Sequence, residues 1–279
     1  MRFRHTIFRI RKWRPARPLI IAALKTFWHA RFSKPLSTDR ASNIRPRLPL
    51  PGYNSRLQMV RKVTMAALYV PTSDEFSAGI RAYEKNERRG LTYFEALRNL
   101  RADWGRAELM ADAIWLLLKS WHRPFYMYGP LDLKALARCV EETMHDLDRL
   151  RSREVLSLCA ADEPTVEGLF RAFTVATRRR NKSGSQESTV ATAKAVHLAC
   201  PGFLPLWDNP IAYRYGYTLM WSKDYISFCW QMKELATAVK TYLRPTDDRT
   251  LLKRIDEFNY AAYTKHWIAT GSRNAASAS

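Results

Sequence analysis

Apolar side chains recur at helical spacing over most of the chain that follows residue 72. Residues 132–151 are the clearest case, because their apolar side chains fall on one stripe of a helix: Leu133, Leu136, Val140, Met144, Leu147 and Leu150. Strand-type alternation is weak, and its best example, residues 63–70, fits a helix equally well. We therefore predict an all-α, multi-helix globular body.

Capping signals mark where several of these helices begin. Thr72 and Glu75 have the spacing of a capping box and predict a helix over residues 72–89 that ends at Gly90. Thr92 and Glu95 repeat that spacing and predict a short helix to residue 101. Further helices are expected at residues 106–121, 132–151, 166–177, 189–200, 208–215, 222–243 and 246–268.

Basic residues are concentrated at the start of the chain. The net charge is +20 and the isoelectric point about 10.1, yet residues 1–62 hold 16 Lys and Arg and a single acid, Asp39. The remaining residues contribute only +5. Three prolines in residues 46–51 disfavour a helix and indicate a linker. We predict three parts: a basic, flexible arm with its Pro-rich linker (1–52), a helical body (53–268) and a disordered tail (269–279).

A positive arm favours a polyanionic partner, and nucleic acid, DNA rather than RNA, is the expected one. The longest apolar run of the arm, residues 18–24, is far shorter than the ~20 residues that span a bilayer, so no stable membrane insertion is expected. Three alternatives stay open. The Arg-rich start resembles an organellar import signal, the arm could bind a membrane surface amphipathically, or Met59 or Met65 could be the true first residue.

The four cysteines have no metal-binding spacing. Cys139, Cys159, Cys200 and Cys229 form no Cys-x-x-Cys pair, and only His197 lies within five residues of one of them. We expect no metal and no cofactor, and we expect these thiols to be buried as small apolar side chains in a reducing compartment. This is consistent with a cytoplasmic, nucleoid-associated protein of bacterial type, whose oligomeric state stays unknown.

One charged side chain stands inside an apolar helix. Apolar residues cover most of the circumference of residues 190–200, and Lys194 lies among them. The turn over residues 201–207 is long enough to bring Asp208 back toward this amine, so the two form a candidate catalytic pair of nucleophile and general base. The alternative is structural: Asp208 would cap the next helix, with Lys194 as an ion-pair partner.

The same segment resembles the helix-hairpin-helix DNA glycosylase superfamily. The resemblance lies in Thr192-Ala193, Asp208, Ile211 and Gly216-Tyr217, about 30 residues in all, and implies the fold of that superfamily with Asp208 as its essential carboxylate. Such enzymes extrude a damaged nucleotide and cleave its glycosidic bond. Ala191 stands where bifunctional members carry their lysine, and no Gly-x-Gly hairpin is visible. The segment also resembles some poorly characterised bacterial helical proteins.

A cluster of cations precedes this segment and is a candidate phosphate site. Four cations, a glycine and two serines follow the helix that ends near residue 177, and the alternative is a solvated helix end. Aromatic residues of 121–128 and 203–217 could stack on bases. The predicted nucleic-acid contacts are Arg178, Arg179, Arg180, Lys182, Ser183, Gly184, Ser185, Trp207, Tyr213 and Arg214.

Two functions are therefore expected from the sequence. The first is a DNA-binding protein with a glycosylase-like body and base-excision activity that uses an Asp carboxylate. The second is a non-catalytic nucleic-acid-binding or accessory protein that uses the basic arm.

Overall fold

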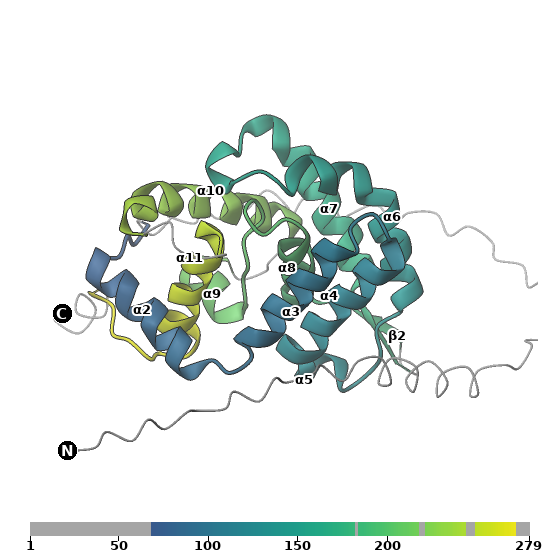
Figure 1. The fold of residues 1–279 in the computed structure, drawn as a ribbon, viewed down its shortest axis with the longest axis horizontal. Helices are drawn as coiled ribbons and strands as arrows, with labels where there is room; N and C mark the ends of the chain where they lie inside the picture. Colours follow the sequence, from purple (N-terminus) through teal and green to yellow (C-terminus); the bar gives the residue numbers. More distant parts are fainter. Residues whose placement is uncertain (1–67, 182–183, 218–220, 244–248, 272–279) are drawn as a thin grey trace, which may run out of the picture. The chain divides into compact units, whose positions relative to one another are not determined.

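The computed structural model describes residues 68–181, 184–217, 221–243 and 249–271 (Figure 1). All of them fall within residues 61–279, one of two units into which the chain divides. The predicted arm, its linker and residues 272–279 of the predicted tail lie outside the described residues, as do Lys182, Ser183 and the predicted helix start at Thr246.

Most of the described chain is helical, which confirms the all-α prediction. The helices are α2 (Ser73–Asn86), α3 (Gly90–Ala102), α4 (Ala107–Trp121), α5 (Arg123–Tyr126), α6 (Leu133–Leu150), α7 (Glu163–Ala176), α8 (Thr189–Ala199), α9 (Asn209–Arg214), α10 (Ser222–Val239) and α11 (Leu251–Asn259). Short 3₁₀ turns η1 (Val155–Ser157), η2 (Ala160–Asp162) and η3 (Lys240–Tyr242) and a π-helical turn η4 (Tyr260–Thr264) join them. Strands β1 (Arg179–Asn181) and β2 (Gly184–Gln186) form an antiparallel hairpin.

Helix α8 is the central helix of the described fold. Every residue from Val190 to Ala199 is buried, as the distribution of apolar residues around this helix predicts. It packs against α3, α4 and α7, and the Ser188 hydroxyl caps its start by accepting a hydrogen bond from the Ala191 amide. Figure 1 shows α8 in the middle, with the hairpin and α11 toward opposite ends. Lys194, on this helix, is therefore only 9% exposed.

The predicted start of the first described helix is correct, because a capping box forms there. Thr72 forms the expected capping box with Glu75, with distances of 3.3 Å and 2.8 Å. The prediction at the next boundary is wrong: α2 ends at Asn86, and Gly90 begins α3 instead of ending α2. The Thr92 hydroxyl, inside α3, therefore does not cap a helix start and instead accepts a weak hydrogen bond from Ser120 on α4.

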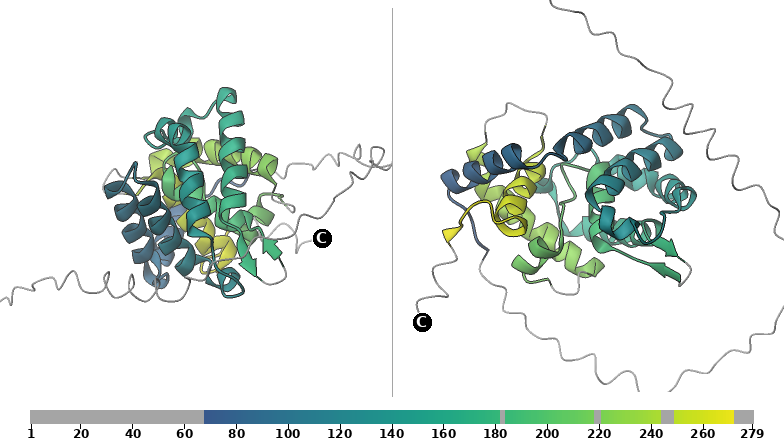
Figure 2. Two further views of the ribbon diagram at one scale, coloured as in Figure 1. Left: turned by 90° about the vertical axis from the view of Figure 1, so that its right-hand side faces the viewer. Right: turned by 90° about the horizontal axis from the view of Figure 1, so that it is seen from below.

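The basic run after α7 is a hairpin, not the helix end predicted for it. The side chain of Arg179 lies over the rings of Phe125 and Tyr128, and its guanidinium donates to the Phe125 carbonyl at 2.7 Å. Gly129 allows the hairpin to approach, because a Cβ there would stand 2.2 Å from the Arg180 carbonyl oxygen. Contacts with a distant segment therefore hold these short strands, and both views of Figure 2 show the hairpin at the edge of the fold.

An aromatic cluster fixes the loop between α8 and α9. Trp207 is 1% exposed and packs against Tyr225 and Phe228, with ring centroids 5.2 Å and 5.4 Å away. Its indole Nε1 donates to the Thr189 carbonyl at 3.1 Å, so the ring is held at both its apolar and its polar edge. This anchor sets the position of the neighbouring Asp208.

Three of the four cysteines are buried, as predicted, whereas Cys159 is exposed. Among the described helices, none is both long enough and apolar enough to cross a membrane.

Candidate active site

A cavity of about 150 Å³ lies where α2, α4, α8, α9 and α11 meet. It brings the two predicted catalytic residues, Lys194 and Asp208, to the wall of one partly open space. Its other walls are formed by Tyr83, Glu87, Arg89, Trp121, Leu206, Trp207, Ile211, Asp256, Tyr260 and Thr264. The cavity therefore combines aromatic and apolar walls with ionisable groups of both signs.

Lys194 reaches the cavity from the buried helix α8. Its Nζ donates a hydrogen bond to the carbonyl of Trp121 at 2.8 Å. Trp121 is the last residue of α4, and carbonyls at a helix end have no partner inside the helix and carry partial negative charge. Burial nevertheless lowers the pKa of Lys194 from 10.5 to about 8, although the charge of Asp208 opposes that shift.

This lowered pKa predicts that Lys194 makes stability depend on pH. Between about pH 8 and 10.5 the unfolded chain binds more protons at this amine than the folded chain, so stability should rise with pH. We compare the free energy of unfolding of the wild type with that of Lys194→Met. As the pH rises from roughly 7 to 10, this difference should shift in favour of the wild type by about 2 kcal/mol. Urea unfolding across this range measures the difference.

The matched control is Lys223→Met, which removes an exposed lysine of α10. Its stability should follow that of the wild type at every pH. Parallel curves for wild type and Lys194→Met would contradict a lowered pKa at Lys194.

Asp208 begins α9 and faces the cavity. One carboxylate oxygen accepts a hydrogen bond from the Ile211 amide at 3.0 Å, so this residue is the helix cap that its position predicts. Both oxygens also accept from the Thr264 hydroxyl, at 2.9 Å and 3.0 Å. Burial raises the pKa of Asp208, and these two donors oppose the rise because they favour the charged form.

The structure thus confirms that Lys194 is buried, but it does not pair this amine directly with Asp208. Of the contacts made in the described part of the chain, the amine bonds the Trp121 carbonyl and the carboxylate bonds Ile211 and Thr264. The two charges attract one another across the cavity. A small group that enters between them would meet an amine on one side and a carboxylate on the other.

A π-helical turn supplies part of this arrangement. Helix α11 continues into η4, where the backbone hydrogen bonds span one residue more than in an α-helix, and π-turns are frequent at functional sites. Both ends of the turn, Tyr260 and Thr264, line the cavity. Tyr260 accepts a hydrogen bond from Arg89 at 2.6 Å, and Arg89 is also paired with Glu87 at 2.6 Å. Burial would raise the pKa of Glu87, but its hydrogen bonds with Arg89 lower it to about 2.

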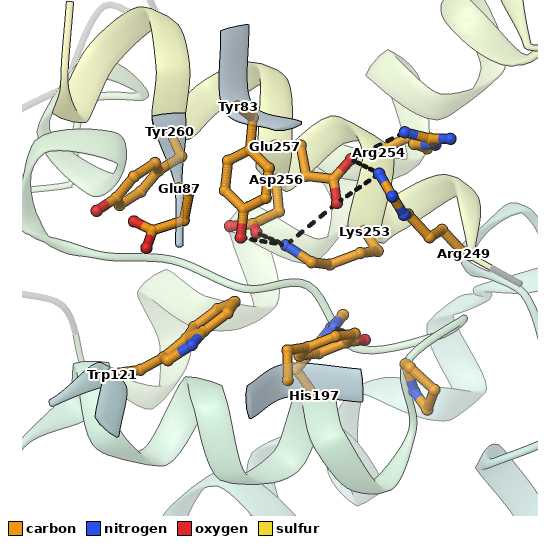
Figure 3. Close-up of polar contacts among 12 residues, drawn as sticks. Tyr83, Glu87, Trp121, His197, Arg249, Lys253, Arg254, Asp256, Glu257 and Tyr260 are labelled. Atoms are coloured by element: carbon orange, nitrogen blue, oxygen red, sulfur yellow. Dashed lines mark hydrogen bonds and ion pairs between the residues drawn. The ribbon is translucent and has the colours of Figure 1, made fainter. Parts of the chain in front are cut away.

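Asp256 of the cavity wall belongs to a buried ion network that no local sequence pattern predicted (Figure 3). Lys253 is 1% exposed, and its Nζ lies 2.7 Å from Asp256 and 3.7 Å from Glu257. The same amine lies over the rings of Tyr83, Tyr93 and Trp121, at 4.6–5.1 Å from their centroids. Burial would lower the pKa of Lys253, but Asp256 and the other neighbours raise it well above 10.5. Lys253 is therefore a permanent cation, unlike Lys194.

The outer side of this network joins α11 to α2. Arg249 and Arg254 each lie 3.2 Å from the fully buried Glu257. They also bond Glu84 of α2, at 2.7 Å and 2.9 Å. The network thus holds Asp256 at the cavity wall and the two helices together.

His197 is a core residue outside the cavity walls. The Leu204 carbonyl, 2.7 Å from Nδ1, can only accept, so Nδ1 carries the proton and Nε2 accepts from the Tyr93 hydroxyl at 2.9 Å. Burial lowers the pKa of His197 to about 4, so the ring is neutral near pH 7. It supports the packing of α8.

The predicted nucleic-acid contacts lie in three places. The first is the hairpin and the residue before it: Arg179 is half-buried and bonded as described, Arg180 pairs with Asp132 at 3.4 Å, and Gly184 and Ser185 are exposed. Arg178, just before β1, is half-exposed.

The other two places are the cavity wall and α9. Trp207 belongs to the core and meets the cavity, so it is not an exposed stacking platform. On α9, Tyr213 is 54% exposed, and Arg214 lies over the rings of Tyr69 and Tyr263. The hairpin and the cavity are thus separate features.

Within the described residues, no group of three or more His, Cys, Asp or Glu side chains is placed to hold a metal ion. Comparison of the chain with protein-family models, with curated proteins and with solved structures finds no match. The cavity and its charges are therefore the basis for a functional proposal.

Proposed function

We propose that this protein binds DNA and removes a damaged base by cleaving its glycosidic bond, with Asp208 as the essential carboxylate and Lys194 in support. The observation that carries the proposal is the 150 Å³ cavity, in which a buried amine and a buried carboxylate face the same space. The resemblance of residues 188–217 to the helix-hairpin-helix glycosylases supports the same choice.

The shape of the cavity suits a base taken out of the stack. A cavity of about 150 Å³ holds a ring the size of benzene. Its walls include the side chains of Tyr83, Trp121, Trp207 and Tyr260. Enzymes that extrude a base hold it between aromatic or apolar side chains and read its edge with polar groups. The ionisable side chains of this cavity can supply such hydrogen bonds.

Asp208 and Lys194 fit different steps of that chemistry. Positive charge develops on the sugar as a glycosidic bond breaks, and a carboxylate at that place stabilises it. With a pKa of about 8, roughly a tenth of the Lys194 side chains are uncharged at neutral pH. Such an amine can accept a proton from the water that adds to the sugar C1′ as the C1′–N bond breaks, and the departing base takes up a proton in return. The hydrogen bonds from Ile211 and Thr264 hold the Asp208 carboxylate in the orientation in which it would stabilise this positive charge.

The test uses the full chain and a panel of duplexes that each carry one damaged base. We expect free base to be released from at least one of them, detected by chromatography, and none from the undamaged duplex. If every damaged duplex stays intact, the glycosylase proposal fails.

A second candidate is a nucleic-acid-binding protein without catalysis, and the charge distribution favours it. Residues 1–52 carry 13 Lys and Arg and one Asp, a net +12. Removal of these residues should flatten the dependence of log K on log salt by about 0.9 for each phosphate contact that is lost on duplex DNA. Fluorescence anisotropy across a salt series measures the slope, with circular dichroism as the folding control. An unchanged slope would show that the arm is not the binding element.

A further inference from the structure

A second hollow, open to the surface, lies beside the candidate active site. This groove, of about 800 Å³, is formed by the end of α4 and by α5. It is lined by Arg89, Trp115, Lys119, Arg123, Tyr126 and Met127, with Ser120 and Pro124. Arg89 lines the active-site cavity too, so the groove and the cavity share this residue in their walls.

The charged side chains that line the groove are all positive. Its ionisable side chains other than Tyr126 are Arg89, Lys119 and Arg123, and no carboxylate lines it. Lys119 and Arg123 are exposed, and neither makes an ion pair with any residue that the structure describes. The part of the chain after residue 62 has a net charge of only +5. The unpaired charges of Lys119 and Arg123 therefore make a local positive surface. Such a surface attracts polyanions.

The groove also offers surfaces on which bases can stack. Trp115 and Tyr126 pack edge to face with ring centroids 5.0 Å apart, and both are partly buried against the core while they line the groove. Beside them Met127 is 67% exposed. Grooves that bind a single strand combine cations that follow the phosphates with aromatic rings that stack on bases. An acidic protein partner would use the cations but would gain less from the rings.

The junction at Arg89 is held rigidly. The guanidinium bonds Glu87 and Tyr260 at the cavity, and the backbone carbonyl accepts from Trp121 Nε1 at 3.1 Å. Arg89 therefore stays fixed in the wall that the groove and the cavity share. A strand that lies along α5 would run next to this shared wall.

We propose that the groove between α4 and α5 binds the phosphodiester backbone of the nucleic-acid strand whose nucleotide enters the cavity, through Lys119 and Arg123. This inference rests on the proposed function for the identity of the ligand. It adds the path of the strand and two residues that hold it.

The test compares two full-length double variants with the same change in charge. Lys119→Gln with Arg123→Gln removes both groove cations, and Lys223→Gln with Lys240→Gln removes two exposed cations of α10 and η3. Figure 1 shows α10 and α5 at opposite sides of the fold. The probe is a short fluorescein-labelled single strand of mixed sequence, titrated by anisotropy at several salt concentrations.

We expect the groove variant to lower the magnitude of the log–log salt slope by about 1.4, since each single-strand phosphate contact contributes roughly 0.7. The control variant should keep the wild-type slope. Equal slopes for the two variants would overturn the groove proposal, and so would a wild type that does not bind the strand.

The two proposals fail in different ways. Loss of slope in the groove variant, together with no base release from any duplex, supports the groove and removes the glycosylase proposal. If base is released but the groove variant keeps the wild-type salt slope, the glycosylase proposal is supported and the groove proposal fails.

Discussion

Lys253→Met is expected to destabilise the protein by about 3–5 kcal/mol, because it leaves the buried carboxylate of Asp256 without its cation and weakens the charge balance at Glu257. Asp256 loses its partner at 2.7 Å, and Glu257 loses one of three cations while it stays fully buried. Three aromatic rings around the amine leave little room for water to replace it. The free energy of unfolding in urea measures the loss.

Two further variants test whether the loss of stability comes from the buried charge. Lys223→Met removes an exposed lysine and should change stability by less than about 0.5 kcal/mol. Lys253→Met combined with Asp256→Asn removes both charges of the shorter pair, so it should recover part of the lost stability. If Lys253→Met is as stable as Lys223→Met, the network is not holding α11 in place.

The sequence identified the parts of the cavity that local patterns determine. Burial of Lys194 follows from the apolar residues that surround it on α8, and the cap at Asp208 follows from its place before Asn209-Pro210. Both residues reach the same cavity, as the length of the intervening turn predicts. What the turn length does not determine is which atoms they bond.

The rest depended on partners that are distant in the sequence. Lys253 and Glu257 have the spacing of an ordinary pair on the surface of a helix, and only their apolar neighbours Leu252 and Ile255 hint at burial. The rings around Lys253 come from residues more than 130 positions away, such as Trp121. Likewise, Arg179 is fixed by Phe125, so its strand leaves no signal in the local sequence.

The partner of Lys194 illustrates the same limit. A carbonyl at the end of a helix is an acceptor that every helix offers, so no residue type marks it in a sequence. The Trp121 carbonyl bonds Lys194 because α4 and α8 pack together, which is a property of the folded chain.

Asp208→Asn is expected to lower base release by about 10²–10⁴-fold, because the amide cannot carry the negative charge that the reaction needs. The change keeps the shape of the side chain. Its amide oxygen can still accept from the Ile211 amide or the Thr264 hydroxyl, and Asn caps a helix about as well as Asp. Removal of a buried charge with a raised pKa should leave stability unchanged or slightly increased. Rates of base release and urea unfolding, measured on the same samples, separate the two effects.

Asp224→Asn is the matched control, because Asp224 accepts a hydrogen bond from the Trp221 amide at the start of α10, outside the cavity walls. It removes the same charge from the first turn of another helix and should keep full activity. An Asp208→Asn protein that releases base as fast as Asp224→Asn would show that the carboxylate only begins α9. If both variants lose activity in proportion to stability, the effect is structural, and the cavity has no catalytic carboxylate at Asp208.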